Sequence, residues 1–258
     1  MNTEKKMVYY HNDLNEFIFP NFKKLHFDLF YSLIYLLKRK EEVSVSFHDL
    51  KELMTDGNPG KISDSDFKGL LAKTHDIVMS GIITTKTKDI IKSISIFKEF
   101  EVNFKEKTVT VKVNSDYVNL FVDFTSCFTK WDLQTFIGLK SRYSKTLFRL
   151  FTQYYTIGTL RLSYEDFRNI LQIPEGYRED NIDQRVIKPA LAELKTLPQF
   201  KKLSFKKEKS SNHGNPVVAY CFDNLRDSKQ SKDVPVAEIF KAFDVEINEG
   251  DPDRLPFE

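Results

Sequence analysis

The sequence has few of the residues on which disulfide-bonded or metal-stabilised folds depend. Its 258 residues include two cysteines, Cys127 and Cys221, and five widely separated histidines. Two distant thiols can form one bridge at most, which excludes a disulfide scaffold and favours a reducing compartment. A zinc site from these residues is not expected, and we predict neither a metal nor another cofactor.

Long hydrophobic runs are also missing. The most apolar segment, Leu29 to Leu37, is too short to cross a bilayer. The first residues, Met1 to Lys6, are polar and are not followed by the apolar core of a signal peptide. We therefore expect a cytoplasmic protein without a membrane partner.

The motifs of common catalytic sites are absent as well. The chain has no Walker-type phosphate loop, no Gly-x-Ser-x-Gly, no His-Glu-x-x-His and no His-x-His pair. The carboxylate pairs Asp64/Asp66 and Asp251/Asp253 are conceivable metal ligands, but the first pair begins a predicted helix, where aspartate is favoured for capping. We predict that the protein is not an enzyme.

The amino-acid composition is that of a folded protein with a nearly neutral net charge. Hydrophobic residues make up 41% of the chain and charged residues 29%, and the net charge is +2. Binding to nucleic acid would therefore depend on local clusters of charge. The length suits two domains, each with its own core.

Part of the sequence is repeated at a shift of 117 residues. Ser46–Met54 aligns with Ser163–Leu171, and each segment begins with a serine followed three residues later by an aspartate, which is typical of a capped helix start. The same shift places Asp64–Leu71 on Asn181–Lys188. Two copies of one small domain explain this repeat.

Both copies show the order helix, strand, helix, helix, hairpin. In the first copy, apolar spacing and turn residues predict helices at 21–40, 46–54, 64–80 and 117–124 and strands at 43–45, 90–97, 100–104 and 108–113. In the second they predict helices at 145–155, 163–171 and 181–197 and strands at 160–162, 200–205 and 217–222, with a short helix at 236–243. Thr129 with Asp132 indicates a further capped helix start.

This order is that of the winged helix. We predict an α+β fold of tandem duplicated winged-helix domains, with domain one at 1–125, domain two at 126–226 and a flexible tail at 227–258.

Side chains that can read DNA bases gather in the second copy. The helix beginning at Asn181 leaves Asn181, Gln184, Arg185 and Lys188 available, with Asp183 among them. Arginine recognises guanine, and asparagine or glutamine recognises adenine, in the major groove. A solvated helix face is the competing interpretation.

Basic residues flank this helix on both sides in the sequence. The predicted wing contains Lys201, Lys202, Lys206, Lys207 and Lys209, opposed by Glu208. Upstream, a supporting helix begins with Lys140, Arg142 and Lys145, with Tyr143 and Ser144 among them. These clusters predict a phosphate clamp around the recognition helix.

Pro189 affects the shape of the predicted recognition helix. Pro189 lies inside the predicted recognition helix, so we expect a kink or a late helix start there.

The matching helix of the first copy offers Lys68 and Lys73 among acidic residues. We expect it to read less sequence and to hold phosphates or a second copy of the chain.

Three segments resemble the iteron-binding plasmid replication initiators, in particular the RepB-like proteins of theta-replicating plasmids. They are Leu139–Phe151, Arg185–Leu194 and Val8–Asn15, and the resemblance covers residues 8–225. It implies a monomer that binds direct repeats of double-stranded DNA at the origin, helps to melt AT-rich DNA and recruits the host initiator and helicase proteins. It also implies copy control by homodimers that join through the first domain and repress the initiator's own promoter.

The resemblance also assigns residues. It implies that Arg142, Tyr143, Ser144 and Lys145 contact phosphate and that Asn181 to Lys188 enter the major groove. Three alternatives remain open: a transcriptional repressor that binds an inverted repeat as a dimer, a nicking enzyme that uses Tyr154 or Tyr155, and winged helices that contact only proteins. Aromatic spacing around Tyr154 and Tyr155 favours a buried helix over base stacking or catalysis.

Overall fold

A computed structural model describes residues 5–15, 17–19, 21–38, 40–80, 82–86, 91–121, 127–211 and 215–226. The predicted tail at 227–258, its expected helix, the pair Asp251/Asp253 and the predicted domain boundary at 125/126 lie outside the described residues. Below, the first half means the described residues up to Phe121, and the second half means those from Cys127 to Arg226.

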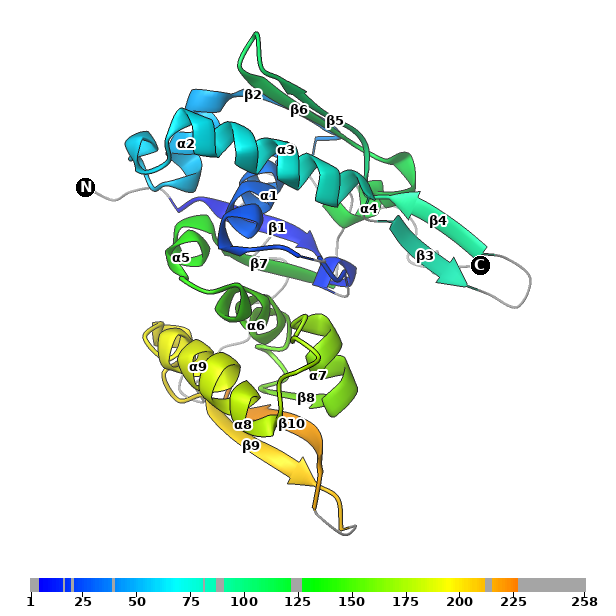
Figure 1. The fold of residues 1–258 in the computed structure, drawn as a ribbon, viewed down its shortest axis with the longest axis vertical. Coiled ribbons are helices and arrows are strands. Elements are labelled where there is room, and N and C mark those ends of the chain that lie inside the picture. The colour runs from blue at the N-terminus through cyan, green and yellow to red at the C-terminus, as the bar shows by residue number, and fades with distance from the viewer. Residues whose placement is uncertain are drawn as a thin grey trace, which may run out of the picture. The chain divides into compact units, whose positions relative to one another are not determined.

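The first half is a winged helix (Figure 1). Its elements are α1 (Lys24–Leu37), β2 (Glu42–Ser46), α2 (Phe47–Met54), η2 (Pro59–Lys61), α3 (Asp64–Ser80), β5 (Phe97–Asn103) and β6 (Thr108–Val113). The strands form an antiparallel sheet in the order β2-β6-β5, in which the hairpin β5–β6 is the wing. A separate ribbon pairs β3 (Ile82–Lys86) with β4 (Ile91–Ser95), and η3 (Ser115–Tyr117) and α4 (Val118–Phe121) end this half.

The second half repeats this architecture. It contains α6 (Arg142–Gln153), β8 (Thr159–Ser163), α7 (Tyr164–Ile170), α8 (Glu179–Ile182), η4 (Asp183–Ile187), α9 (Lys188–Leu194), η5 (Pro198–Phe200), β9 (Ser204–Lys209) and β10 (Val217–Asp223). Its sheet order, β8-β10-β9, matches that of the first half. The predicted α+β fold with two winged helices is confirmed.

The repeated capping serines occupy equivalent places in the two halves. The Ser46 hydroxyl accepts a hydrogen bond from the Asp49 amide at 3.1 Å, and the Ser163 hydroxyl accepts one from the Asp166 amide at 3.0 Å. These bonds satisfy backbone donors that the first turns of α2 and α7 would otherwise leave unpaired. The shift of 117 residues therefore has a structural basis.

A strand pair that the sequence did not predict joins the two halves. β1 (Met7–His11) runs antiparallel to β7 (Phe128–Asp132), and η1 (Asn12–Asn15) and α5 (Leu133–Gly138) follow the respective strands. The capped start predicted at Thr129 is wrong, because Thr129 lies in β7 opposite Tyr10. The cap of α5 is Asp132, which accepts the Thr135 amide at 2.9 Å.

Aromatic side chains form the core on both sides of this strand pair. Between the halves, Trp131 stacks on Phe136 with ring centroids 4.5 Å apart, and Tyr31 packs on both rings at 5.0 Å. Phe148 and Phe151 are buried, as their helical spacing predicted. The chain up to Arg226 forms one compact unit.

Within the described ranges, no helix is both long enough and apolar enough to span a bilayer. In the same part of the chain, no group of three or more His, Cys, Asp or Glu side chains could hold a metal ion.

Candidate nucleic-acid interface

The candidate recognition helix consists of α8, η4 and α9, which follow one another without a break. Its inner face is buried by Ile182, Val186, Ile187, Ala190, Leu191 and Leu194. Gln184, Arg185 and Lys188 are exposed, and Asn181 is half-buried. These four side chains alternate with the buried residues along the helix, so the predicted base-reading side chains share its outer side.

At Pro189, where the sequence predicts a kink or a late helix start, the helix continues from Glu179 and contains a widened turn just before the proline. The Lys188 amide donates to the Asp183 carbonyl, an i to i−5 bond that defines the π-helical segment η4. Proline has no N–H and its ring crowds the carbonyl four residues earlier, which is that of Arg185. A π turn relieves this conflict without ending the helix.

Arg185 is positioned by a contact that the sequence did not reveal. Its guanidinium lies 5.5 Å from the centroid of the Tyr177 ring, a cation–π arrangement that limits the side chain's motion. Tyr177 belongs to the loop before α8, and Arg168 of α7 donates to the carbonyls of Tyr177 and Pro174, both at 2.9 Å. Arg168 therefore orders the loop that supports Arg185.

Asp183 and Lys207 are paired with each other. Lys207 Nζ in β9 lies 2.5 Å from Asp183 Oδ2, and both side chains are mostly buried. In this geometry the ion pair occupies the lysine and places Asp183 against the wing, so their direct DNA contacts stay a prediction that requires the pair to open. The pair connects the recognition helix to the wing.

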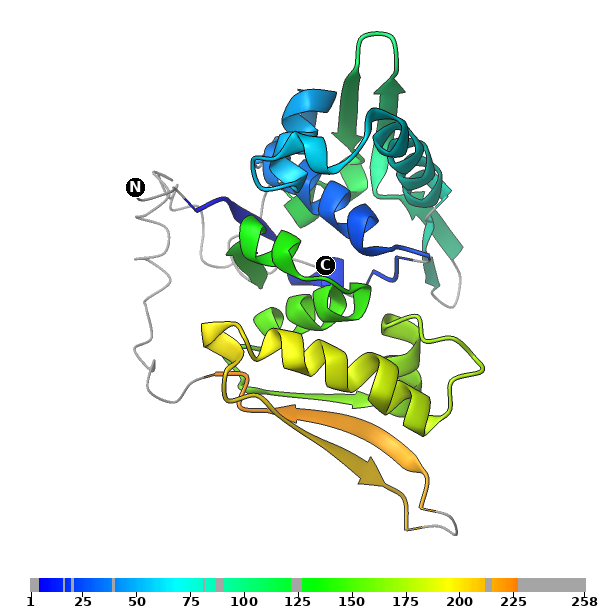
Figure 2. The same ribbon diagram turned by 60° about the vertical axis from the view of Figure 1, so that its left-hand side comes forward.

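The wing of the second half presents most of its predicted basic residues to solvent. Lys201, Lys202, Lys206 and Lys209 are exposed along the approach to β9 and on β9 itself. The hairpin of β9 and β10 extends past the α8 end of the recognition helix, which is the end where the helix begins (Figures 1 and 2). Lys206 lies 3.3 Å from Asp223 but remains 64% exposed, so phosphate can still approach it.

Glu208, the acidic residue among these lysines, is neutralised locally. Arg161 of β8 reaches its carboxylate at 2.7 Å. The hydrogen bond from Arg161, with a second from the Cys221 thiol, holds the pKa of Glu208 below its usual value. The wing therefore carries an excess of positive charge.

The start of α6 differs from the prediction. Ser144 and Lys145 are fully buried, so the expected phosphate contacts of these two side chains are wrong. Ser144 lies in the capped first turn, where its amide donates to the Ser141 hydroxyl at 2.9 Å. Lys145 forms an ion pair with Asp28 at 2.7 Å.

Arg142 and its neighbours remain near the surface. Arg142 is half-buried, lies over the Tyr143 ring at 4.7 Å and donates to the Gln172 carbonyl at 2.8 Å. Lys140 is exposed, while its amide donates to Glu193 of α9 at 2.6 Å. Lys140, Arg142 and Tyr143 thus stay candidates for phosphate contact.

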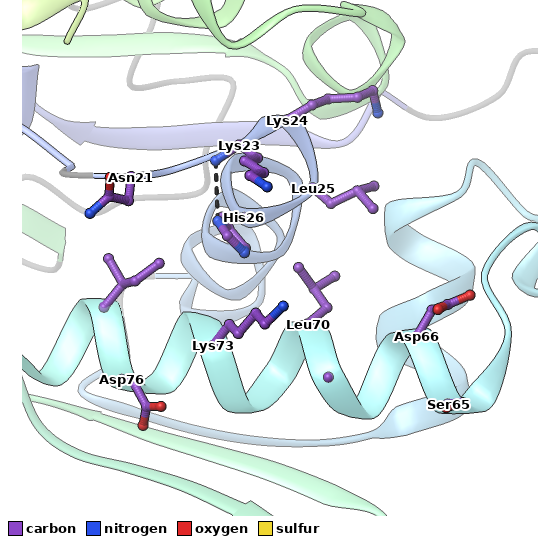
Figure 3. A pocket seen from close by; sticks show the side chains of 12 residues that line it. Asn21, Lys23, Lys24, Leu25, His26, Ser65, Asp66, Leu70, Lys73 and Asp76 are labelled. Carbon is purple, nitrogen blue, oxygen red and sulfur yellow. Dashed lines mark hydrogen bonds between the residues drawn. The ribbon is translucent and has the colours of Figure 1, made fainter. Parts of the chain in front are cut away.

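The corresponding helix of the first half, α3, carries two lysines but none of the asparagine, glutamine or arginine side chains that commonly read bases. Lys68 and Lys73 are exposed on α3. Lys73 borders a groove of about 630 Å³ between α3 and the start of α1, where Lys23 and His26 face it (Figure 3). Burial lowers the pKa of His26, so the lysines supply the positive charge there.

Acidic groups on α3 have local partners. Asp64 pairs with Lys51 at 2.8 Å, and Asp66 accepts the Ser63 hydroxyl at 2.7 Å. These contacts support the interpretation of this carboxylate pair as part of a helix start. α3 carries no asparagine, glutamine or arginine, so it lacks the base-reading side chains of the recognition helix.

Comparisons with known proteins agree with this architecture. A family model described as "Initiator Replication protein, WH1" matches residues 7–152, and one described as "Initiator Rep protein, WH2" matches residues 163–224. A "Probable replication protein rep" of Bifidobacterium longum (strain NCC 2705) is 24% identical over 192 residues, which is 73% of this chain. That alignment spans 64% of the relative's own length.

A solved structure has the same fold. "Crystal structure of Pi initiator protein in complex with iteron DNA" aligns with a TM-score of 0.64 at 15% sequence identity. The alignment covers 88% of this chain and 99% of the other. The fold of this chain therefore also occurs in an initiator protein that was crystallised with iteron DNA.

Proposed function

Because this chain belongs to the initiator replication protein family, matched in both of its halves, we propose that it initiates plasmid replication by binding direct repeats at the origin. It acts without enzymatic activity, on double-stranded DNA, in the cytoplasm where a plasmid is replicated. Sequence recognition is the task of the second half.

The observation that carries this proposal is the exposed side of the recognition helix. Asn181, Gln184, Arg185 and Lys188 lie on one side of it. Such side chains read purine edges in the major groove. The exposed lysines of the wing supply the phosphate contacts that orient a reader on the duplex.

The two halves have different tasks in this proposal. Domain two, at 126–226, reads the repeat, while domain one, at 1–125, adds phosphate contacts through Lys68 and Lys73 and joins two chains into a homodimer. The dimer represses the promoter of its own gene, and the monomer opens the origin and recruits the host initiator and helicase. Two observations support this division: α3 has no asparagine, glutamine or arginine that could read bases, and exposed lysines gather in the wing of the second half.

Footprinting on the DNA next to the protein's own gene tests the proposal. We expect protection of several direct repeats beside an AT-rich segment. Protection of one inverted repeat alone would contradict the initiator and identify a dimeric repressor. Absence of any protection at low salt would leave protein contacts as the role of both winged helices.

Replacing Arg185 tests the assignment of the reader. Arg185→Ala should weaken binding to the specific site by about 1–3 kcal/mol, because one bidentate base contact is lost, with little change on random duplex. Quantitative binding to both duplexes at one salt concentration measures this difference. Lys195→Ala, at the exposed far end of the same helix, is the matched control.

An equal loss on both duplexes would show that Arg185 contacts only phosphate. A loss of the same size for Lys195→Ala would show that charge, and not position on the helix, determines the effect.

A further inference from the structure

Equivalent positions of the two halves meet each other where the halves join. Asp28 and Lys145 are 117 residues apart, which is the shift of the repeat, and they form a buried ion pair at 2.7 Å. Next to the strand pair, the Thr129 hydroxyl of β7 donates to the side chain of Asn12 in η1 at 2.7 Å. β1 and β7, each the first strand of its half, pair about their middle residues, Tyr9 and Lys130.

Contacts between equivalent positions are the mark of a twofold axis. In a symmetric interface, the residue on the axis meets its own counterpart, and strands that cross the axis run antiparallel. β1 and β7 run antiparallel here. The two halves are thus joined as two copies of a symmetric dimer would be, except that both copies belong to one chain.

The ion pair at this axis is buried and well defined. Asp28 and Lys145 are both 0% exposed, and Lys24 reaches the second oxygen of Asp28 at 2.6 Å. Lys145 also donates to the Phe136 carbonyl and lies over the Phe136 ring at 4.2 Å. A charge in such a place is strongly disfavoured unless its partner carries the opposite charge.

Like halves could not repeat this arrangement. If the first halves of two chains met through the same face, Asp28 would lie against another Asp28, and two second halves would bring Lys145 against Lys145. Arg149 adds to the difference, because it donates to the Leu14 carbonyl at 2.8 Å and to Asn15 at 3.0 Å. Its equivalent in the first half is Ser32, which is too short for these bonds.

We propose that Asp28 and Lys145 select the pairing of unlike halves, so that the joint forms between the first and second half and never between two first halves. The partner that this face of the first half accepts is a second half of this chain. The homodimer proposed above must then form through another face. This inference concerns pairing of the halves and does not depend on DNA binding.

Reversing the charge of Asp28 in one chain and of Lys145 in another tests whether these two residues determine which halves pair. Asp28→Lys places two lysines at the joint, and Lys145→Asp places two aspartates there, so each variant alone should lose the joint. In an equimolar mixture, the first half of the Asp28→Lys chain complements the second half of the Lys145→Asp chain, and the remaining two halves carry the natural pair. We therefore expect a one-to-one dimer with two restored joints.

The readouts are native mass spectrometry of chains with different isotope labels and the fluorescence of Trp131, which is buried at the joint. Both variants are refolded from urea separately and together, so that a variant that fails to fold alone still gives a result in the mixture. Combining both exchanges in one chain should restore part of the stability of the joint, because Lys24 and the Phe136 carbonyl favour the natural orientation of the pair.

The matched control is the exposed pair of Glu99 and Lys112, 3.1 Å apart in the first wing. Glu99→Lys and Lys112→Glu should neither disturb the joint nor associate on mixing. The proposal would be overturned if mixing the Asp28→Lys and Lys145→Asp chains gave no mixed dimer and no more folded protein than each variant gives alone. It would also be overturned by an Asp28→Lys chain that is folded by itself with an unchanged Trp131 signal.

Discussion

Lys145 illustrates how the surroundings of a single side chain determine its task. In the sequence it stands among Lys140, Arg142 and Tyr143, and this neighbourhood predicted a phosphate contact. In the fold it turns inward to Asp28, which is 117 residues away in the chain. No local pattern reveals a partner at that distance, whereas the exposure of Arg185 and Lys188 followed from apolar spacing in one helix.

The buried position of Lys145 leads to a prediction about pH. Burial lowers the pKa of Lys145 from 10.5 to about 8, against the attraction of Asp28. The unfolded chain then keeps this proton at higher pH than the folded protein does, so the free energy of unfolding should rise between pH 8 and 10.5. The whole shift corresponds to about 3 kcal/mol.

Urea unfolding at several pH values measures this contribution. The reference is the double variant Asp28→Leu/Lys145→Met, which has no titrating pair at the joint and replaces it with apolar groups. As the pH rises, the free energy of unfolding of the natural chain should increase relative to that of this variant. A difference that stays constant or falls would contradict the lowered pKa.

The wing of the second half contains lysines that are exposed to solvent and a lysine that is held in an ion pair. Lys209 is exposed, whereas Lys207 is held by Asp183 at 2.5 Å. Lys209→Ala should weaken binding to all duplexes and reduce the slope of log affinity against log salt by about one, because one counterion fewer is released. Lys207→Ala should leave that slope unchanged.

Titrations on specific and random duplexes at several salt concentrations compare the two variants. Equal reductions of the slope would mean that Lys207 leaves Asp183 when DNA binds. An unchanged slope for Lys209→Ala would remove the wing from the phosphate contacts.

Most helices and wing strands could be predicted, because periodicity and capping are local properties. The caps at Ser46 and Ser163 belong to this group. β9, however, begins at Ser204 and not at the predicted Phe200, which ends the 3-10 helix η5. β1 and β7 could not be predicted, since each is a short strand whose partner lies in the other half of the chain. Thr129 was misassigned for the same reason: its spacing to Asp132 resembles a cap, but its pairing with Tyr10 is a tertiary contact.

For the whole molecule, the shared core at the joint predicts cooperative unfolding. Trp131 reports on the joint, and far-ultraviolet circular dichroism reports on the helices of both halves. Because the joint buries charges and aromatic rings from both halves, the two signals should change together in urea, as in a two-state transition. Loss of the Trp131 signal at lower urea would show that the halves separate before they unfold.

Capping variants extend this test to each half. Ser46→Ala and Ser163→Ala each remove one cap and should lower the free energy of unfolding by about 1 kcal/mol. In a cooperative molecule both variants shift the same single transition. Two transitions that respond separately would contradict the prediction.

The pairing of β1 with β7 also affects how the chain folds during synthesis. Paired residues are separated by 117 positions at one end, His11 and Phe128, and by 125 at the other, Met7 and Asp132. At about 5–20 residues per second, a ribosome needs roughly 6–25 s to deliver the partner strand. Throughout that interval the nascent chain carries an open β edge, the feature through which neighbouring chains on a polysome exchange strands.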